Sequence, residues 1–157
     1  MAIYLGIDIN KKYTQISSLD TQTGEPVTLS QTGKDEIYAI PVCICKKNGT
    51  NEWLCGFDAR GFSDDPDYSG VWDLFDAALS DRKANIDGED ISCSLLFALY
   101  IQKLLMIASA RFSFKNADKV IFTSYELKSR LISLIDVVSS YIPVPREKIL
   151  LKSYKET

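Results

Sequence analysis

The first apolar segment of the chain constrains the fold most. Residues 3–9 read Ile-Tyr-Leu-Gly-Ile-Asp-Ile, with apolar side chains on both sides of an extended strand. Such a strand is typical of the centre of a sheet that other layers cover on both faces. The segment therefore predicts a central, doubly covered strand.

Turn-forming residues divide the N-terminal region into three strands. Asn10, Lys11 and Lys12 interrupt the first strand, and asparagine tolerates the left-handed backbone of a tight turn. The strand-like segments that follow are residues 13–19 and 26–29. We expect the three strands to form an antiparallel meander.

The middle of the chain, about residues 36–90, reads as an inserted small α+β subdomain. It contains strand-like segments, a loop or short helix, and an amphipathic helix, in the order 36–45, 52–55, 56–70 and 71–79. Pro41 favours a bulge or an edge position for its strand. Residues 81–90 are polar and acidic and read as a connection, which makes them the clearest internal boundary.

The C-terminal part alternates helices with strands. Residues 91–111 are apolar all round, as in a buried crossover helix, and residues 119–122 and 148–151 read as short strands. Thr123 and Glu126 have the spacing of a capping box for a second helix. The apolar residues along one face of that helix are Leu127, Leu131, Leu134, Ile135 and Val138.

Without the insertion the element order is β-β-β-α-β-α-β. We therefore expect an α/β protein with a ribonuclease-H-like, mixed, five-stranded sheet and helices packed on it. Its core comprises residues 1–35 and 91–157, and the inserted subdomain follows the third strand.

Composition limits the chemistry and the partners. The 157 residues include no histidine, which excludes serine or cysteine triads that use histidine and every metal site that needs it. The 18 Lys+Arg and 21 Asp+Glu residues give a net charge of −3, so we expect no nucleic-acid partner. The start of the chain lacks a signal-peptide pattern, and no uninterrupted apolar run is long enough to span a bilayer. We expect a cytoplasmic protein without membrane insertion.

The four cysteines, at positions 43, 45, 55 and 93, lack the paired spacing of structural zinc sites. The spacing favours small buried thiols in a reducing compartment, with a cysteine-only metal site as the alternative.

Residues 6–14 read Gly-Ile-Asp-Ile-Asn-Lys-Lys-Tyr-Thr and resemble the first phosphate-binding segment of the actin, sugar-kinase and heat-shock-chaperone ATPase superfamily. The chaperones read roughly G-I-D-L-G-T-T-Y-S there. Residues 39–42 resemble their I-P-S strand, residues 53–60 their V-G-x-x-A-K segment, and the strand at Val120 with its following helix their V-I-T-V-P strand and helix. The chain resembles the N-terminal lobe (domain I) of this superfamily, and the N-terminal region of uncharacterised bacterial actin-like proteins.

The resemblance implies a nucleotide site for ATP or ADP with Mg²⁺. Asp8 would hold Mg²⁺ through water, and the amides around Asn10, Lys11 and Lys12 would contact phosphate oxygens. Arg60 falls where the chaperones place a phosphate-contacting lysine. The sequence departs from the pattern, because Asn10 replaces the turn glycine and two lysines replace hydroxyl residues. The same residues also fit a solvated turn, a strand-end acid and a surface arginine.

The resemblance covers only one lobe, and the second lobe of such an ATPase has no counterpart in these residues. We therefore expect a nucleotide-phosphate-binding lobe that does not hydrolyse ATP efficiently alone, and we assign no catalytic residue. The alternative is a degenerate actin-like scaffold or interaction module, with Phe62, Tyr68 and Trp72 of the insertion as candidate contacts for a protein partner or self-assembly. A metal-dependent nuclease is disfavoured because residues 119–123 carry no acid to join Asp8.

Overall fold

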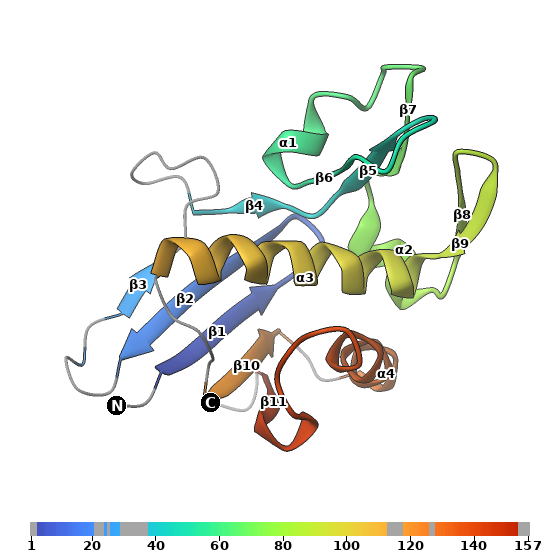
Figure 1. The fold of residues 1–157 in the computed structure, drawn as a ribbon. Helices are drawn as coiled ribbons and strands as arrows, with labels where there is room; N and C mark the ends of the chain where they lie inside the picture. The colour runs from blue at the N-terminus through green and yellow to red at the C-terminus, as the bar shows by residue number, and fades with distance from the viewer. Residues whose placement is uncertain are drawn as a thin grey trace.

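The computed structural model describes residues 3–20, 24, 26–28, 38–112, 118–125 and 128–153. Figure 1 shows the helix α3 lying across a central sheet, with a smaller sheet beyond it. In chain order the elements are β1 (Ile3–Ile9), β2 (Tyr13–Asp20), β3 (Pro26–Thr28), β4 (Ile40–Pro41), β5 (Ile44–Lys47), β6 (Trp53–Cys55), α1 (Phe57–Arg60), β7 (Tyr68–Val71), α2 (Leu74–Leu79), β8 (Lys83–Ile86), β9 (Glu89–Ser92), α3 (Cys93–Phe112), β10 (Lys119–Ser124), α4 (Ser129–Ser139), the 3-10 helix η1 (Arg146–Lys148) and β11 (Ile149–Ser153).

The main sheet is mixed, which makes the protein an α/β protein. Its strand order is β11-β10-β1-β2-β3, with β1 central as predicted. The first three strands form the expected antiparallel meander, whereas β10 runs parallel to β1 and β11 parallel to β10.

The sheet has six strands rather than the expected five, because β4 also pairs with β2. The eight residues of β2 are long enough for two short partners, β3 along residues 17–19 and β4 along residues 13–14. Pro41 lies in this short edge strand, as its missing N–H predicts.

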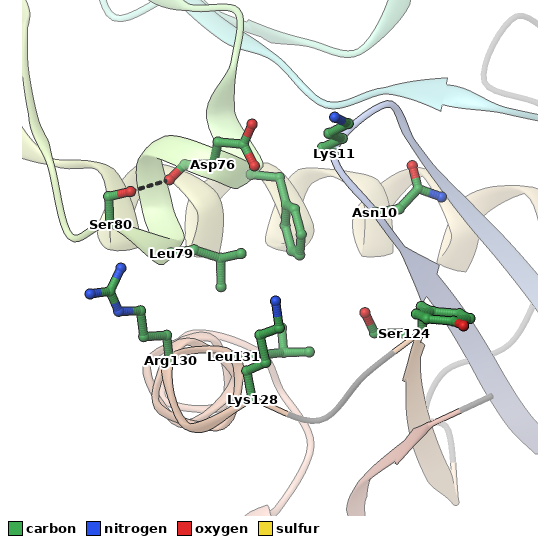
Figure 2. Close-up of a pocket in the computed structure, with 11 residues that line it drawn as sticks. Asn10, Lys11, Asp76, Leu79, Ser80, Ser124, Lys128, Arg130 and Leu131 are labelled. Carbon is green, nitrogen blue, oxygen red and sulfur yellow. Dashed lines mark hydrogen bonds between the residues drawn. The ribbon is translucent and has the colours of Figure 1, made fainter. Parts of the chain in front are cut away.

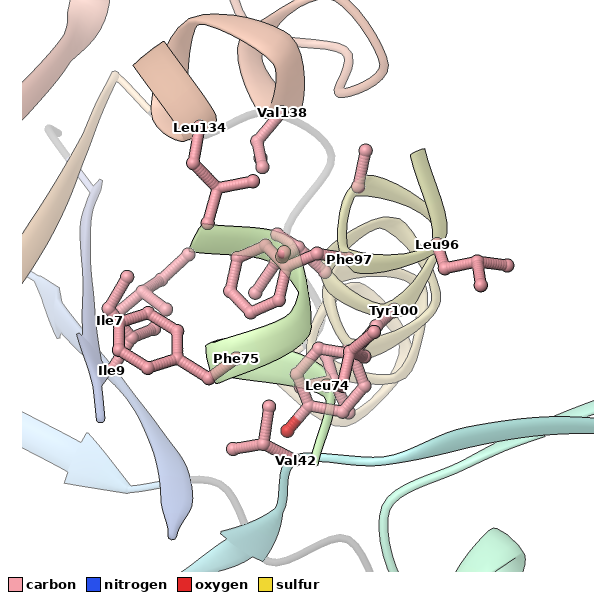
Figure 3. Close-up of a cluster of buried hydrophobic side chains, with 14 of the residues drawn as sticks. Ile7, Ile9, Val42, Leu74, Phe75, Leu96, Phe97, Tyr100, Leu134 and Val138 are labelled. Carbon is pink, nitrogen blue, oxygen red and sulfur yellow. The ribbon is translucent and has the colours of Figure 1, made fainter. Parts of the chain in front are cut away.

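One face of the main sheet carries most of the core. Leu5, Ile7 and Ile9 are at most 2% exposed, whereas Tyr4 and Asp8, on the opposite face, are half-buried. Figure 3 shows Ile7 and Ile9 in one cluster with side chains of α2, α3 and α4. All three helices therefore contribute to the same core, and the other face of β1, predicted to be covered as well, is only half-buried among the described residues.

The helix α3 forms the centre of this core. Phe97, Tyr100 and Ile101 are fully buried, but Leu95 and Met106 are exposed, so the helix is not enclosed on all sides. Its segment Cys93–Ala110 is long and apolar enough to cross a membrane, yet half of it is buried within the fold. A mostly buried core helix can meet the same criterion of length and hydropathy, so this finding is weak evidence for a membrane span.

The inserted region is less separate than its sequence suggests. The strands β6, β5 and β7 form their own antiparallel sheet. In contrast, β4 belongs to the main sheet, and Leu74 and Phe75 of α2 are buried in the main core. The predicted helix at 71–79 is shorter, because Val71 ends β7 and α2 begins at Leu74.

Two further local predictions are wrong. Residues 83–92 form the hairpin β8–β9 rather than a polar connection, and its turn residues Asp87 and Gly88 both have positive φ. Thr123 does not cap a helix, because it lies in β10 and pairs with Asp8. The helix α4 begins at Ser129, while Glu126 and Leu127 lie outside the described residues.

The small sheet has a core of its own. Cys43, Cys45 and Ala59 are buried there, and the three aromatic residues proposed as partner contacts pack against them. The rings of Phe62 and Tyr68 stack with their centroids 4.1 Å apart. The aromatic residues Phe62, Tyr68 and Trp72 thus stabilise the small sheet instead of forming an exposed patch.

We predict that Gly70→Ala destabilises the protein by about 1–3 kcal/mol, because the added methyl group overpacks the small sheet. A Cβ at Gly70 would lie 2.6 Å from both the Cβ of Cys45 and the carbonyl oxygen of Ile44. Gly61→Ala is the matched control, because no atom lies within 4 Å of its Cβ and its φ is −70°. Urea unfolding should show a lower midpoint for Gly70→Ala only, and equal midpoints would contradict this packing.

Burial of the thiols predicts that the stability of the protein depends on pH. Burial raises the pKa of Cys43 from 9.0 to about 11 and that of Cys55 to about 12. The unfolded chain therefore loses these protons first, and the free energy of unfolding should fall as the pH rises from 9 to 11. Urea unfolding across this range should show the decline, with a shallower slope for Cys55→Ala. A stability independent of pH above 9 would contradict the buried, inert state of the thiols.

Candidate functional site

The turn between β1 and β2 is held by the side chain of Asn10. The Asn10 backbone N–H donates to the carbonyl oxygen of Tyr13 at 3.1 Å. Its Oδ1 accepts hydrogen bonds from the backbone N–H groups of Lys12 and Tyr13, at 2.9 and 3.0 Å. The described non-glycine residues with positive φ are Asp81 and Asp87, so the left-handed conformation expected for Asn10 is wrong. Asparagine suits this turn through its side-chain oxygen.

The hydrogen bonds within this turn reduce the number of backbone amides that could bind a phosphate. The Lys12 amide, which sequence reasoning assigned to a phosphate, already donates to Asn10. The side chains of Lys11 and Lys12 are instead exposed at the tip of the turn. A ligand anion would therefore meet the two ammonium groups more readily than a nest of backbone amides.

Asp8 lies apart from the two hollows described below. It alternates with Ile7 and Ile9 and so faces the half-buried side of the sheet, where the hydroxyl of Thr123 donates to its Oδ1 at 3.5 Å. Among the described residues, no three acidic, cysteine or histidine side chains converge as a metal site. Magnesium held by Asp8, through water and ligand oxygens, stays a prediction.

Arg60 is positioned by an unusual glycine. Gly56 precedes α1 with φ +63° and ψ −131°, a conformation that only glycine adopts readily. Its N–H donates to the carbonyl oxygen of Cys43, and its carbonyl oxygen accepts hydrogen bonds from the Cys43 thiol and the Arg60 N–H. The guanidinium of Arg60 lies 4.8 Å from the centroid of the Phe57 ring. These contacts fix the short helix beside Cys43 and orient Arg60.

The fold brings three of the predicted residues to one hollow. We call it the basic hollow; it has a volume of about 600 Å³ and is lined by Lys11, Lys12, Tyr13, Ala39, Pro41, Val42, Cys43, Arg60, Ser63 and Trp72. Among the described residues, the lining contains three cationic side chains and no carboxylate. The buried indole N–H of Trp72 has no hydrogen-bond partner within the described part of the chain. Such a lining favours an anionic ligand.

A second hollow lies on the other side of Lys11. We call it the α4 hollow; it has a volume of about 490 Å³ and is lined by Asn10, Lys11, Phe75, Asp76, Leu79, Ser80, Ser124, Tyr125, Lys128, Arg130 and Leu131. Figure 2 shows Lys128 and Arg130 rising from the start of α4 and Lys11 entering from the turn. Sequence reasoning missed Ser124, Lys128 and Arg130 as ligand-binding candidates. The signal available was their place just after a parallel strand, where α/β proteins commonly bind ligands.

The comparisons with known proteins give a family without an assigned activity. A search of the curated proteins found no match to the chain. Residues 25–157 match the model of a family of unknown function, DUF5716, C-terminal. Arg60 and most of the α4 hollow lie within the matched residues, whereas β1 and the lysines of the turn precede them. Because the match spans most of the sequence, the chain belongs to the DUF5716 C-terminal family.

Proposed function

We propose that the chain is a nucleotide-phosphate-binding lobe of the actin-like ATPase type. The phosphates of ATP or ADP bind in the basic hollow, with Lys12 and Arg60 as their main cationic contacts and Lys11 at the rim. The observation that carries the proposal is that these three cations, from the β1–β2 turn and α1, line one hollow whose described residues include no carboxylate. Three cationic side chains around one hollow favour a polyanionic ligand over a neutral one.

The proposed fold is ribonuclease-H-like, as in that superfamily. The strand order β11-β10-β1-β2-β3 supports it, because the first three strands are antiparallel and β10 and β11 run in the direction of β1. The helix α3 precedes β10 and α4 precedes β11, which agrees with two crossover connections.

In this proposal Asp8 is the residue that would hold Mg²⁺. Mg²⁺ keeps much of its water shell and is bound in proteins by one or two carboxylates together with ligand phosphates. Asp8 lies near the end of β1, two residues before Asn10, where the turn that carries the lysines begins. A hydrated ion can therefore link its carboxylate to the phosphate oxygens. Bound Mg²⁺ would neutralise phosphate charge; the chain's own lysines and arginine orient the phosphates. The proposal assigns binding and no hydrolytic step.

The experiment is a calorimetric titration of Mg-ATP into the full chain at low ionic strength. Lys12→Ala and Arg60→Ala should each weaken binding about tenfold, because each removes a charge-assisted hydrogen bond to phosphate. Asp8→Asn should weaken binding in the presence of Mg²⁺ and have little effect with ATP alone.

Lys47→Ala is the matched control, because Lys47 is an exposed lysine at the end of β5 and lines neither hollow. Circular dichroism should show that every variant remains folded. Absence of wild-type binding, or equal losses for Lys47→Ala and Lys12→Ala, would reject the phosphate site. Absence of binding would favour the scaffold instead.

A further inference from the structure

The α4 hollow lies where the parallel strands of the sheet end. Asn10 follows β1, and Ser124 is the last residue of β10, which pairs in parallel with β1. The carboxyl ends of such strands are the usual place for a ligand in an open α/β sheet, because the chain leaves the sheet there. The hollow is large enough for a small molecule.

The hydroxyl of Ser124, a largely buried residue, lines this hollow. Ser124 is only 8% exposed, yet its hydroxyl group has no hydrogen-bond partner among the residues that the structure describes. Figure 2 shows this hydroxyl on the side of the hollow that faces Lys128. A ligand oxygen in the hollow could therefore accept the hydrogen bond of this hydroxyl without displacing a protein partner.

The start of α4 adds positive charge. Lys128, its N-cap residue, provides no side-chain cap, and the first turn contains no acidic residue. The first N–H groups of the helix therefore receive no side-chain hydrogen bond from the N-cap residue, and the helix dipole favours an anion at this end. Among the described residues, Lys11, Lys128 and Arg130 line the hollow together with one carboxylate, that of Asp76.

The remaining wall is apolar. Phe75, Leu79 and Leu131 also line the hollow, and Phe75 and Leu131 are at most 8% exposed. A free inorganic anion would leave this surface in contact with water, whereas a ligand with an apolar body would cover it. The lining therefore favours a molecule with one strongly anionic end and an apolar body.

We propose that the α4 hollow is a second ligand site, specific for a small organic phosphate monoester with an apolar or aromatic body. The phosphate group accepts hydrogen bonds from the Ser124 hydroxyl and the first turn of α4, and pairs with Lys128 and Arg130. The apolar body packs against Phe75, Leu79 and Leu131. This site does not depend on nucleotide binding in the basic hollow, and Lys11 is the one described residue that lines both hollows.

The test uses 4-fluorophenyl phosphate as the probe and ¹⁹F NMR of the full chain as the readout. We expect the probe to bind at least tenfold more tightly than 4-fluorophenol, which lacks the phosphate, and more tightly than inorganic phosphate measured by competition. Ser124→Ala and Arg130→Gln should each weaken binding about fivefold to tenfold, because each removes a hydrogen bond to a charged group.

Two matched variants separate this site from its neighbours. Ser133→Ala changes an exposed serine of α4 that does not line the hollow, and Arg60→Gln changes the basic hollow; neither should affect the probe. Absence of probe binding, or no loss in Ser124→Ala and Arg130→Gln, would overturn the proposal. An equal loss in Arg60→Gln would place the probe in the basic hollow and also overturn it. Mg-ATP binding is measured separately, so failure of one site leaves the other testable.

Discussion

The hydrogen bond from the Tyr100 hydroxyl to the carbonyl oxygen of Pro41, 3.0 Å long, is the contact on which the basic hollow depends. Tyr100 is fully buried in α3, so this bond fixes the point where the chain leaves the main sheet after β4. Cys43, two residues on, hydrogen-bonds to Gly56, and Gly56 begins the helix that carries Arg60. A buried aromatic side chain thus helps to hold the segment that leads to Arg60 beside the β1–β2 turn, where Pro41 also pairs with Tyr13.

The main sheet could be predicted because burial dictates its sequence. The alternation at Leu5, Ile7 and Ile9 and the apolar run at β10 are consequences of packing on one core, so pattern alone locates them. The hairpin β8–β9 was missed because its strands are largely exposed and polar, although the Asp87-Gly88 pair is a recognised turn signal. The start of α4 was misplaced because strand pairing of Thr123 with Asp8 outweighs its local capping pattern.

The candidate site was also predicted only in part, because motifs identify single residues but not the hollows that distant residues form together. Resemblance placed Lys11, Lys12 and Arg60 together, and the fold lines one hollow with all three. The role of Asn10 could not be read from its residue type, because the same asparagine suits either a left-handed turn or a side-chain acceptor. The end of β10 at Ser124 was a signal for one part of the α4 hollow, but its full lining could not be predicted, since it joins residues from the turn, α2 and α4 that are distant in the sequence.

The central claim is that the lysines of the turn and Arg60 form one phosphate site, and an NMR titration of the ¹⁵N-labelled chain with Mg-ATP tests it most directly. The account predicts that the largest shifts of backbone amide resonances occur together at Lys11, Lys12 and the residues of α1, with a common binding curve. Shifts confined to one of these segments, or no shift at either, would contradict the account.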